Sequence, residues 1–334
     1  MELSTTKYLL TMGELHRKDN TLVFKNVKGS THIPIEGIHE FYCLNEISFN
    51  TKLLDILGRT GIIVHFFNYY QQYCGSFYPK EQLISGRLVV QQAMAFLDRR
   101  LEIASAIVRG IAKNVHFVLY HYYRQGKKEL KPFLDWLRKE LPRLVEETND
   151  IHQLLFLEGT IWKKFYDTFS IFLPSSFIFN KRVRRPPDNP MNALISFGNS
   201  LLYAKTISQI YRTHLDQSIS FLHEPSEARF SLSLDLCEVF KPIVVFKTIF
   251  ECVNNRKLQV GKHFDKELNY CLLNESGRKI FLQSFEERIQ SVFEHATLKR
   301  KVSLQGAIKL DGYKLIKHIT EGKEFIPFSM EVKK

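Results

Sequence analysis

An imidazole and two carboxylates stand close together in one stretch of the sequence, residues 221–242 (FLHEPSEARFSLSLDLCEVFKP). His223 lies just before Pro225, and Asp235 and Glu238 follow three residues apart in an otherwise apolar run. Carboxylate oxygens and an imidazole nitrogen can bind a hard divalent ion, and the same groups serve acid–base chemistry. The stretch is therefore a candidate site for either kind of chemistry.

The apolar residues after Pro225 indicate a helix that begins near Ser231 and continues to the next proline. A spacing of three residues puts Asp235 and Glu238 on one face of this helix. If His223 belonged to the same helix, it would lie about 18 Å from Asp235, too far away to share a ligand. The proline and the polar residues that follow it favour a bend instead, and a bend can bring His223 back toward the helix.

A third carboxylate, Glu158, lies in the apolar segment LLFLEGTIWKKFYDTF. A lone glutamate on a helix is most often solvated. The neighbours Leu154, Leu157 and Ile161, however, put Glu158 at the edge of a buried face, where an unpaired carboxylate is costly. Gly159 lowers helix stability by about 1 kcal/mol relative to alanine, and close approach of a ligand or another backbone would justify that loss. Glu158 is therefore a candidate functional residue.

The densest cluster of basic residues is NKRVRRPPDNP (180–190), a loop that its prolines stiffen. A solvated loop and a loop that contacts phosphate are both open interpretations. If the loop contacts phosphate, we expect Arg184 and Arg185 to contact the DNA backbone. Lys163 and Lys164, which lie on the helical turns after Glu158, are expected to contact it as well. Such contacts position DNA without reading its bases.

Residues 1–78 have the pattern of a small β-rich domain with one helix. Asn50 is expected to cap this helix and Gly61 to end it. The expected strands are 7–11, 14–17, 21–24, 39–44 and 62–67, and the helix is 51–59. No catalytic motif occurs in this domain, so we expect it to act as a scaffold or in dimerisation.

Residues 79–334 have a helical pattern almost throughout and predict a larger, all-α domain, which gives an α+β fold for the chain. This domain contains all the candidate residues and is therefore the expected catalytic and DNA-binding domain. Its expected helices are 83–113, 115–123, 132–144, 150–169, 192–211, 231–242, 243–252, 275–293 and 304–319. Either Asn149 or Asp150 is expected to cap the helix at 150–169.

The chain of 334 residues has 47 Lys and Arg against 35 Asp and Glu, a net charge of +12 and a pI near 9.3. This balance favours a polyanionic partner, nucleic acid before an anionic membrane, although many basic proteins bind neither. The five cysteines are widely spaced and form no C-x-x-C pair, as in proteins of a reducing cytoplasm. No run of 18 apolar residues and no signal-peptide pattern occur, so we expect a cytoplasmic protein without a membrane span.

Four motifs follow one another after the β-rich domain. They are E-G (158–159), P-P-D-N-P-M-N-A-L-I-S-F-G (186–198), F-L-H (221–223) and D-L-C-E-V-F-K-P (235–242). In this order they resemble the CRISPR-associated adaptation integrase, the Cas one family, over essentially the whole chain. The sequence departs from the family pattern at Ser220, where glycine is expected, at Lys241, where arginine is usual, and at Asn199, where many members have an aromatic residue.

The resemblance implies a metal-dependent DNA endonuclease and integrase that inserts spacer DNA into a CRISPR array. It implies that Glu158, His223 and Asp235 are catalytic and bind Mg²⁺ or Mn²⁺, and that Glu238 is a supporting acid. It also implies double-stranded spacer and repeat DNA as substrates, a homodimer built through the β-rich domains, and a bridging partner of the Cas two family.

Two other functions stay open at this point. One is a metal-dependent DNA repair nuclease that has the same site and no integration activity. The other is a non-catalytic helical DNA-binding module whose acidic residues are structural. All readings that include a metal require the three proposed ligands to converge from separate segments.

Overall fold

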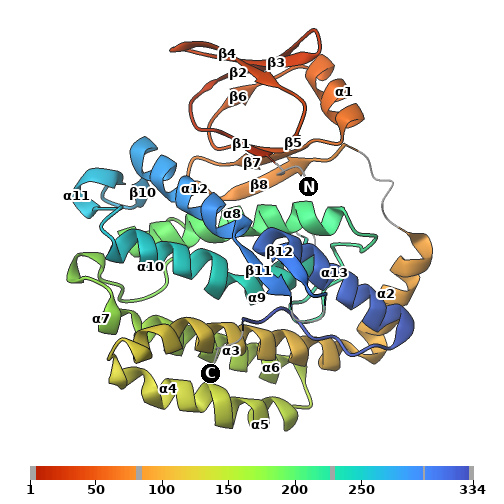
Figure 1. Cartoon of the computed structure of the whole chain (residues 1–334), viewed down its shortest axis with the longest axis vertical. Coiled ribbons are helices and arrows are strands. Elements are labelled where there is room, and N and C mark those ends of the chain that lie inside the picture. The colour runs from red at the N-terminus through yellow and green to blue at the C-terminus, as the bar shows by residue number, and fades with distance from the viewer. Residues whose placement is uncertain (1–4, 80–84, 226–229, 296–297, 331–334) are drawn as a thin grey trace. The chain divides into compact units, whose positions relative to one another are not determined.

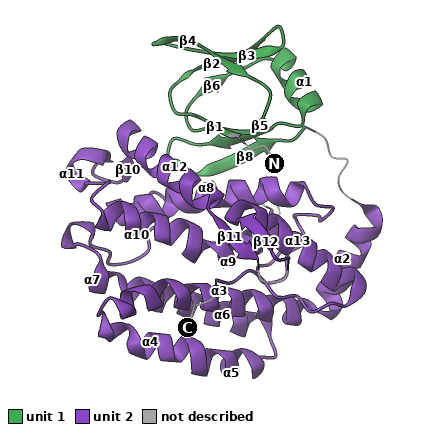
Figure 2. Cartoon of the chain, in the orientation of Figure 1, with its two compact units in different colours: residues 1–83 green, residues 84–334 purple. Residues whose placement is uncertain are grey.

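The computed structural model describes residues 5–79, 85–225, 230–295 and 298–330. The chain forms two compact units, residues 1–83 and 84–334 (Figure 1, Figure 2). The expected division at residues 78 and 79 lies a few residues before this one. None of the helices in the described part of the chain is both long and apolar enough to cross a membrane.

The first unit contains two four-stranded sheets. One sheet has the order β1-β5-β7-β8, in which the first three strands are parallel and β8 is antiparallel to β7. The other has the order β4-β3-β2-β6, with an antiparallel meander of β2, β3 and β4. The strands are β1 (Thr5–Leu9), β2 (Gly13–Lys18), β3 (Thr21–Asn26), β4 (Gly29–Pro34), β5 (Ile38–Cys43), β6 (Ile47–Ser48), β7 (Ile63–Phe67) and β8 (Tyr73–Phe77).

The one helix in the described residues of this unit, 5–79, is α1 (Thr51–Thr60), and it is bounded as the sequence predicts. The side chain of Asn50 accepts a hydrogen bond from the Leu53 N–H, and Gly61 ends the helix in the left-handed conformation. The five expected strands are confirmed, whereas β4, β6 and β8 were not expected. Strand β4 has no alternation of buried and exposed residues, because nearly all its residues are exposed at the sheet edge.

The second unit is mainly helical. Its first helices are α2 (Gly86–Asp98) and α3 (Arg100–Arg124). The sequence predicted a break near residue 114, but α3 continues through it, and the chain bends at Arg99 instead. The guanidinium of Arg99 donates to the carbonyls of His318 and Ile319, far away in the sequence. The boundary between α2 and α3 thus coincides with a tertiary contact of Arg99, which the local sequence pattern does not indicate.

Helix α8 (Pro190–Tyr211) is buried along most of its length and packs against several other helices of the unit. A Cβ atom on Gly198 would lie 2.6 Å from a methyl group of Val245, so the glycine permits this close approach. The other helices up to this point in the chain are η1 (Lys128–Leu130), α4 (Lys131–Asp135), η2 (Trp136–Glu140), α5 (Leu141–Glu146), α6 (Ile151–Asp167), α7 (Phe169–Phe172) and η3 (Ser175–Phe177).

The helix expected at 231–242 begins at Ser231, as predicted, but does not stop at Pro242. Helix α9 (Ser231–Lys241) passes through a π-helical turn, η4 (Pro242–Phe246), into α10 (Lys247–Asn254). Such a turn accommodates a proline that cannot donate the usual backbone hydrogen bond. The result is one nearly continuous helical segment of which α9 is the first part.

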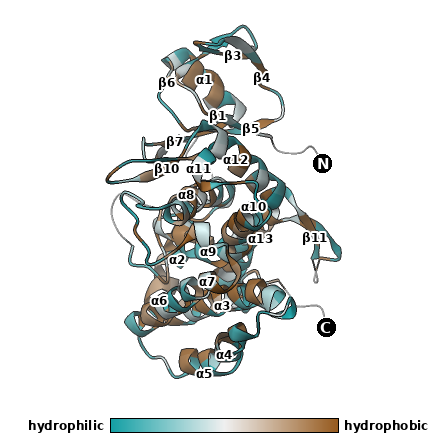
Figure 3. Cartoon of the chain, turned by 90° about the vertical axis from the view of Figure 1, so that its left-hand side faces the viewer, coloured by the Kyte–Doolittle hydropathy of each residue, from teal (hydrophilic) through white to brown (hydrophobic). Residues whose placement is uncertain are grey.

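The prediction of an all-α second domain is wrong in detail. Two antiparallel hairpins interrupt it, β9 (Phe264–Lys266) with β10 (Cys271–Leu273), and β11 (Val292–His295) with β12 (Arg300–Ser303). Their strands are only three or four residues long, too short for a periodic pattern to be recognised. The β11–β12 hairpin is largely hydrophilic (Figure 3). The remaining helices are α11 (Val260–His263), α12 (Glu275–Gln290) and α13 (Leu304–Glu321).

Candidate active site

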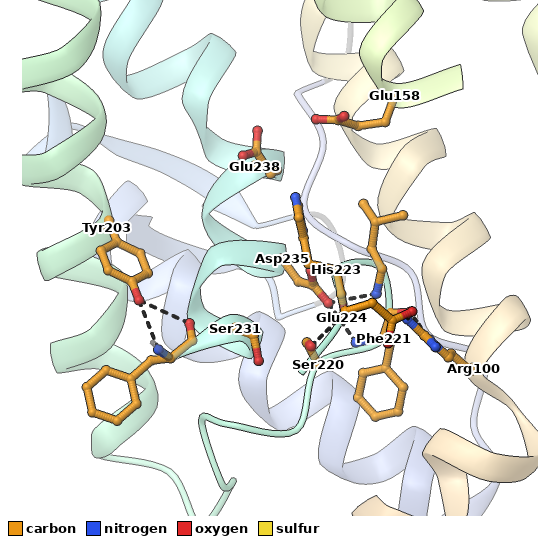
Figure 4. Close-up of polar contacts among 12 residues, drawn as sticks. Arg100, Glu158, Tyr203, Ser220, Phe221, His223, Glu224, Ser231, Asp235 and Glu238 are labelled. Carbon is orange, nitrogen blue, oxygen red and sulfur yellow. Dashed lines mark hydrogen bonds and ion pairs between the residues drawn. The ribbon is translucent and has the colours of Figure 1, made fainter. Parts of the chain in front are cut away.

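A loop that carries His223 is anchored by one buried carboxylate, that of Asp235 on α9 (Figure 4). The backbone N–H groups of Phe221 and Leu222 donate to Asp235 Oδ2 at 2.7 and 2.8 Å. The N–H of His223 donates to Oδ1 at 3.0 Å, and Nδ1 of its ring lies 2.8 Å from the same oxygen. Both carboxylate oxygens of Asp235 are therefore engaged by the loop, each in two contacts.

The contact between the histidine ring and Asp235 also fixes the form of the ring. An ionised carboxylate only accepts hydrogen bonds, so Nδ1 of His223 carries the hydrogen and donates the hydrogen bond to Asp235. The second ring nitrogen, Nε2, then points away from Asp235 and can act as a ligand or base. This carboxylate–imidazole pair is the arrangement that orients many metal-binding histidines.

Two further residues hold the loop. Arg100 on α3 donates from Nε to the Phe221 carbonyl at 2.9 Å, and its Nη2 lies 2.6 Å from the Glu224 carboxylate. The hydroxyl of Ser220, which replaces the glycine of the family pattern, donates to the His223 carbonyl at 2.7 Å. The bend that the sequence predicted is thus present, and His223 does not belong to α9; residues 226–229 lie outside the described part.

Glu158 lies on α6, whose N-terminus Asp150 caps as expected. Its Oε1 accepts a hydrogen bond of 2.5 Å from Nε1 of Trp162, one turn further along the same helix. A glutamate and a tryptophan at this spacing share a helix face. Trp162 was not singled out in the sequence, although its spacing from Glu158 was the available signal.

Glu238 lies one turn after Asp235 on α9 and is buried, with a side chain only 7 % exposed. One of its oxygens, Oε1, forms an ion pair with the ammonium group of Lys241. The other, Oε2, is buried and finds no hydrogen-bond partner among the described residues. A buried carboxylate oxygen without a partner is costly and indicates a missing cation, donor or water.

The side chains do not all converge as the sequence predicted. In Figure 4 the ring of His223 points into the space between the carboxylates of Glu158 and Glu238, whereas the carboxylate of Asp235 turns toward the backbone of 221–223. Consistent with this, His223 and Glu238 both influence the ionisation of Glu158. In the described residues, no three His, Cys, Asp or Glu side chains stand close enough together to hold a metal ion as they are. The three groups share a space but would have to move toward one another.

The electrostatics of this space are dominated by its two glutamates. Burial and the nearby Glu238 carboxylate raise the pKa of Glu158 to about 7, against the opposing effects of His223, Lys241 and Trp162. The pKa of His223 is also raised: burial lowers it, but the hydrogen bond and charge of Asp235 and the charges of both glutamates outweigh burial. The space therefore has an excess of negative potential that favours a cation.

The raised pKa of Glu158 predicts how stability depends on pH in metal-free protein. The pKa in the folded state, about 7, exceeds the ordinary value of 4.5 that applies in the unfolded chain, so the folded state retains a proton that the unfolded state has released. Stability is therefore lost as the pH rises from about 4.5 to 7, by up to about 3 kcal/mol. Glu158→Gln should then be more stable than the unsubstituted protein at pH 8, and nearly equal to it at pH 4.5. Urea unfolding with a chelator at both pH values measures this, and a less stable variant at pH 8 would contradict it.

The basic loop is anchored to α8 by Asn192. Its Oδ1 accepts from the Val183 N–H and from Arg182, and its Nδ2 donates to the Lys181 carbonyl. Arg182 also donates to Ser196 and contacts Tyr166, so its guanidinium is a structural group of the loop. Arg184 and Arg185 are exposed. The cluster thus divides into one arginine that holds the loop and two whose side chains reach the surface.

Tyr166 links this loop to the acidic space. Burial raises its pKa, and the charges that act on it belong to Arg182, Lys241, Glu238 and Arg184. Tyr166 therefore lies near both the basic loop, through its contact with Arg182, and the pair formed by Glu238 and Lys241. Both Lys163 and Lys164 are exposed on α6. The ammonium of Lys164 lies 5.4 Å from the Trp136 ring centroid, so it is directed to the η2 segment and no contact ties it to the acidic space.

Comparison with known proteins agrees with the order of the motifs. Residues 7–287 match the family model described as CRISPR associated protein Cas1. The chain is 42 % identical over 326 residues to the CRISPR-associated endonuclease Cas1 of Fusobacterium nucleatum, with 97 % of this chain and 96 % of that protein covered. It is 43 % identical over 323 residues to a CRISPR-associated protein Cas1 of Methanobrevibacter ruminantium, with 96 % and 97 % covered.

Solved structures give the same result. A Cas1 protein from Thermotoga maritima superimposes with a TM-score of 0.85 at 35 % identity, and 98 % of this chain and 100 % of that one are covered. Two more distant structures share the fold: a casposase bound to integration product (TM-score 0.84, 21 % identity, 98 % and 95 % covered) and a Cas6-RT-Cas1–Cas2 complex (0.83, 20 %, 99 % and 36 %). The family model spans most of the chain, and the curated relatives match over nearly the full length of both sequences. The chain therefore belongs to the CRISPR-associated Cas1 family.

Proposed function

We propose that this protein is a metal-dependent DNA endonuclease and integrase that inserts spacer DNA into a CRISPR array. The observation that carries the proposal is the shared space formed by Glu158, His223 and Glu238, of which Glu238 is buried and the other two are partly exposed, within a chain whose relatives are called Cas1 endonucleases. Two carboxylates that face one space repel each other, and Lys241 pairs with only one of them, so the arrangement has little structural value without a further cation. The non-catalytic reading is disfavoured for this reason.

The donor set suits Mg²⁺ or Mn²⁺, which prefer carboxylate oxygens and accept an imidazole. We assign the ligands as Glu158, Glu238 and Nε2 of His223. Asp235, which the resemblance placed among the ligands, takes the supporting role in this proposal, because both of its oxygens are held by residues 221–223. The unpartnered Oε2 of Glu238 supports the fit, since a cation would satisfy it. The Oε1 atoms would exchange their present contacts with Trp162 and Lys241 for the ion.

Integration is a transesterification, in which the 3′-hydroxyl of one DNA strand attacks a phosphodiester in line and expels another 3′-oxygen. When bound, the ion would neutralise charge on the scissile phosphate and lower the pKa of the attacking hydroxyl. The protein need supply no nucleophile of its own. Asp235 keeps the His223 ring oriented through the Nδ1 contact. Water in place of the hydroxyl would give hydrolysis, hence the endonuclease activity.

Arg184 and Arg185 are proposed to hold the DNA backbone beside this site, since the loop that carries them adjoins it through Tyr166. Replacing both by alanine should weaken binding to duplexes of any sequence and reduce the slope of log K against log salt by about 1 to 2, because two phosphate contacts are lost. Fluorescence anisotropy of a labelled duplex over a salt series measures both quantities. Arg143→Ala is the matched control, because Arg143 is an equally exposed arginine that pairs with Glu140 and Glu147 on α5. An unchanged slope in the double variant would exclude this loop as the contact surface; Lys163 and Lys164 are the next candidates.

The proposed partners are a second copy of this chain and a protein of the Cas2 family. A homodimer formed through the β-rich unit and a bridging Cas2 protein are proposals from the resemblance. In support of them, two structures that share this fold are a Cas6-RT-Cas1–Cas2 complex and a casposase bound to integration product. Co-purification of the full chain with its Cas2 partner, followed by light scattering, tests both.

A strand-transfer assay tests the function as a whole. The protein and its Cas2 partner are incubated with a labelled duplex that ends in a 3′-hydroxyl, and with a supercoiled plasmid that contains the repeat array. An integrase joins the label to the plasmid when Mg²⁺ or Mn²⁺ is present, and not with a chelator. Cleavage of DNA without joining would support the repair-nuclease alternative, and no metal-dependent processing at all would overturn the proposal.

A further inference from the structure

The acidic space of the site already contains a cation of the protein itself, Lys241. Its ammonium group pairs with Oε1 of Glu238, one turn earlier on α9. The ammonium also lies 5.9 Å from the centroid of the Trp162 ring, and Trp162 donates a hydrogen bond to Glu158. One lysine thus reaches the surroundings of both proposed carboxylate ligands.

The lysine is nearly as enclosed as the carboxylate that it neutralises. The side chains of Lys241 and Glu238 are only 13 % and 7 % exposed. Ion pairs in such surroundings are less screened by solvent and salt than pairs at the surface. Among the described residues, the space holds two glutamates, His223 and Lys241, and both His223 and Lys241 favour the ionised form of Glu158. In the absence of metal, Lys241 is therefore the cation that compensates Glu238 directly.

A divalent ion bound by Glu238 would bring a second cation to the same carboxylate. The ion would bind the same carboxylate whose Oε1 the ammonium now contacts, and two cations on neighbouring oxygens of one carboxylate repel each other strongly where the dielectric is low. The flexible four-carbon stem of a lysine allows the ammonium to move while the backbone of α9 stays in place. The face of the Trp162 ring is the nearest alternative position, since an ammonium over an indole face is stabilised by a cation–π interaction.

We propose that Lys241 is a built-in counter-cation that occupies Glu238 in the metal-free protein and competes with the divalent ion for it. The inference rests on the proposed metal-binding function and deepens it, since it identifies what limits metal binding at this site. Lys241 stabilises the empty site and lowers its affinity for metal. The protein accordingly loads metal only where the ion is abundant enough to displace the lysine.

Calorimetric titration of the full-length protein with Mn²⁺ alone tests the proposal, and no DNA or activity is needed. Lys241→Met keeps the length of the side chain and removes the charge. We expect Mn²⁺ to bind this variant at least about tenfold more tightly than the unsubstituted protein, because a repulsion of 1.36 kcal/mol is already worth a factor of ten. Lys247→Met is the matched control: Lys247 lies on α10, in the same helical segment, with its ammonium 5.5 Å from the Phe117 ring, and its loss should leave the affinity unchanged.

A double-mutant comparison separates competition from a general change of fold. If Lys241 acts through Glu238, Lys241→Met should have little effect on Mn²⁺ affinity in a protein that already contains Glu238→Gln. Trp162 provides a second readout: in a Trp136→Phe background it is the only remaining tryptophan, and bound Mn²⁺ should quench it with the same half-saturation as the heat signal. Where Lys241→Met fails to fold, Lys241→Gln keeps a polar group beside Glu238 and should show the same direction of change.

The outcomes distinguish this proposal from the one on which it rests. Tighter binding in Lys241→Met, with the effect lost beside Glu238→Gln, supports both. Equal or weaker binding in a folded Lys241→Met protein, while the unsubstituted protein binds Mn²⁺, overturns the competition and leaves the metal site standing. Absence of Mn²⁺ binding in every variant overturns the metal-dependent function and the competition with it.

Discussion

Glu238→Gln is expected to reduce metal-dependent DNA cleavage and strand transfer by about a thousandfold or more, which corresponds to about 4 kcal/mol of transition-state stabilisation. The amide has the shape of the carboxylate but no charge, so it can neither pair with Lys241 nor bind a divalent ion well. The fold should persist, because Lys241 is partly exposed and can turn its ammonium to solvent. Single-turnover rates with Mn²⁺ measure the loss, and circular dichroism confirms that the variant is folded.

Glu251→Gln is the matched control for this prediction. Glu251 lies on α10 in the same helical segment and pairs with Arg288, away from the acidic space. Its neutralisation should leave the rates within about twofold, since single surface ion pairs contribute little. A Glu238→Gln protein that retains the rate of the control would show that the second carboxylate ligand is another residue, and Asp235 would then be the first alternative.

Asp235→Ala is expected to lower the free energy of unfolding by about 4 kcal/mol or more and to abolish activity as a consequence. The substitution removes the carboxylate that accepts hydrogen bonds from three backbone N–H groups, two of which belong to fully buried residues, and each orphaned buried donor costs about 1–3 kcal/mol. For a unit of this size, the melting temperature should fall by roughly 10 °C. Thermal and urea unfolding measure the change.

Asp216→Ala serves as the comparison, because Asp216 is an aspartate of an exposed turn that accepts hydrogen bonds from the N–H and hydroxyl of Ser218. Its loss should cost no more than about 1 kcal/mol. If Asp235→Ala unfolded at the same urea concentration as the unsubstituted protein while losing its metal affinity, Asp235 would act as a ligand rather than as the anchor of the His223 loop. The two substitutions on α9 thus distinguish the two acids. Glu238→Gln is expected to abolish most of the activity in a folded protein, whereas Asp235→Ala is expected to destabilise the fold and to lose activity as a consequence.

The charges of the proposed metal site also connect the pH prediction for Glu158 with the metal-binding prediction for Lys241. In metal-free protein the two glutamates repel each other, Lys241 compensates one of them, and the raised pKa of Glu158 reflects what is left uncompensated. Loading with metal should therefore stabilise the protein most above pH 7, where Glu158 would otherwise be forced to ionise without a partner. The pH series for Glu158→Gln and the Mn²⁺ titration of Lys241→Met therefore both measure the excess negative charge of the two glutamates, the first through protein stability and the second through metal affinity.

The sequence by itself determined the features that depend on neighbouring residues. The Asn50 cap and the Gly61 end of α1, the start of α9 at Ser231 and the cap at Asp150 all follow from short-range hydrogen bonding and from the spacing of apolar residues. The order of the four motifs was likewise sufficient to identify the family. The short strands could not be predicted from the sequence, because three or four residues are too few to show a period. The continuation of α9 through Pro242 could not be predicted either, because a π-helical turn has no simple sequence signal.

Only the tertiary structure decided which acid faces the site. Asp235 and Glu238 are one turn apart on α9, and their spacing alone puts them on one face. The loop 221–223 packs against the first of them and takes up both of its oxygens, which leaves the second to share a space with Glu158 from α6. The hydrogen-bond partners of Asp235 and Glu238 depend on how the chain packs in three dimensions, so packing decides the role of each carboxylate. The sequence shows only that two carboxylates are present that could bind a metal ion.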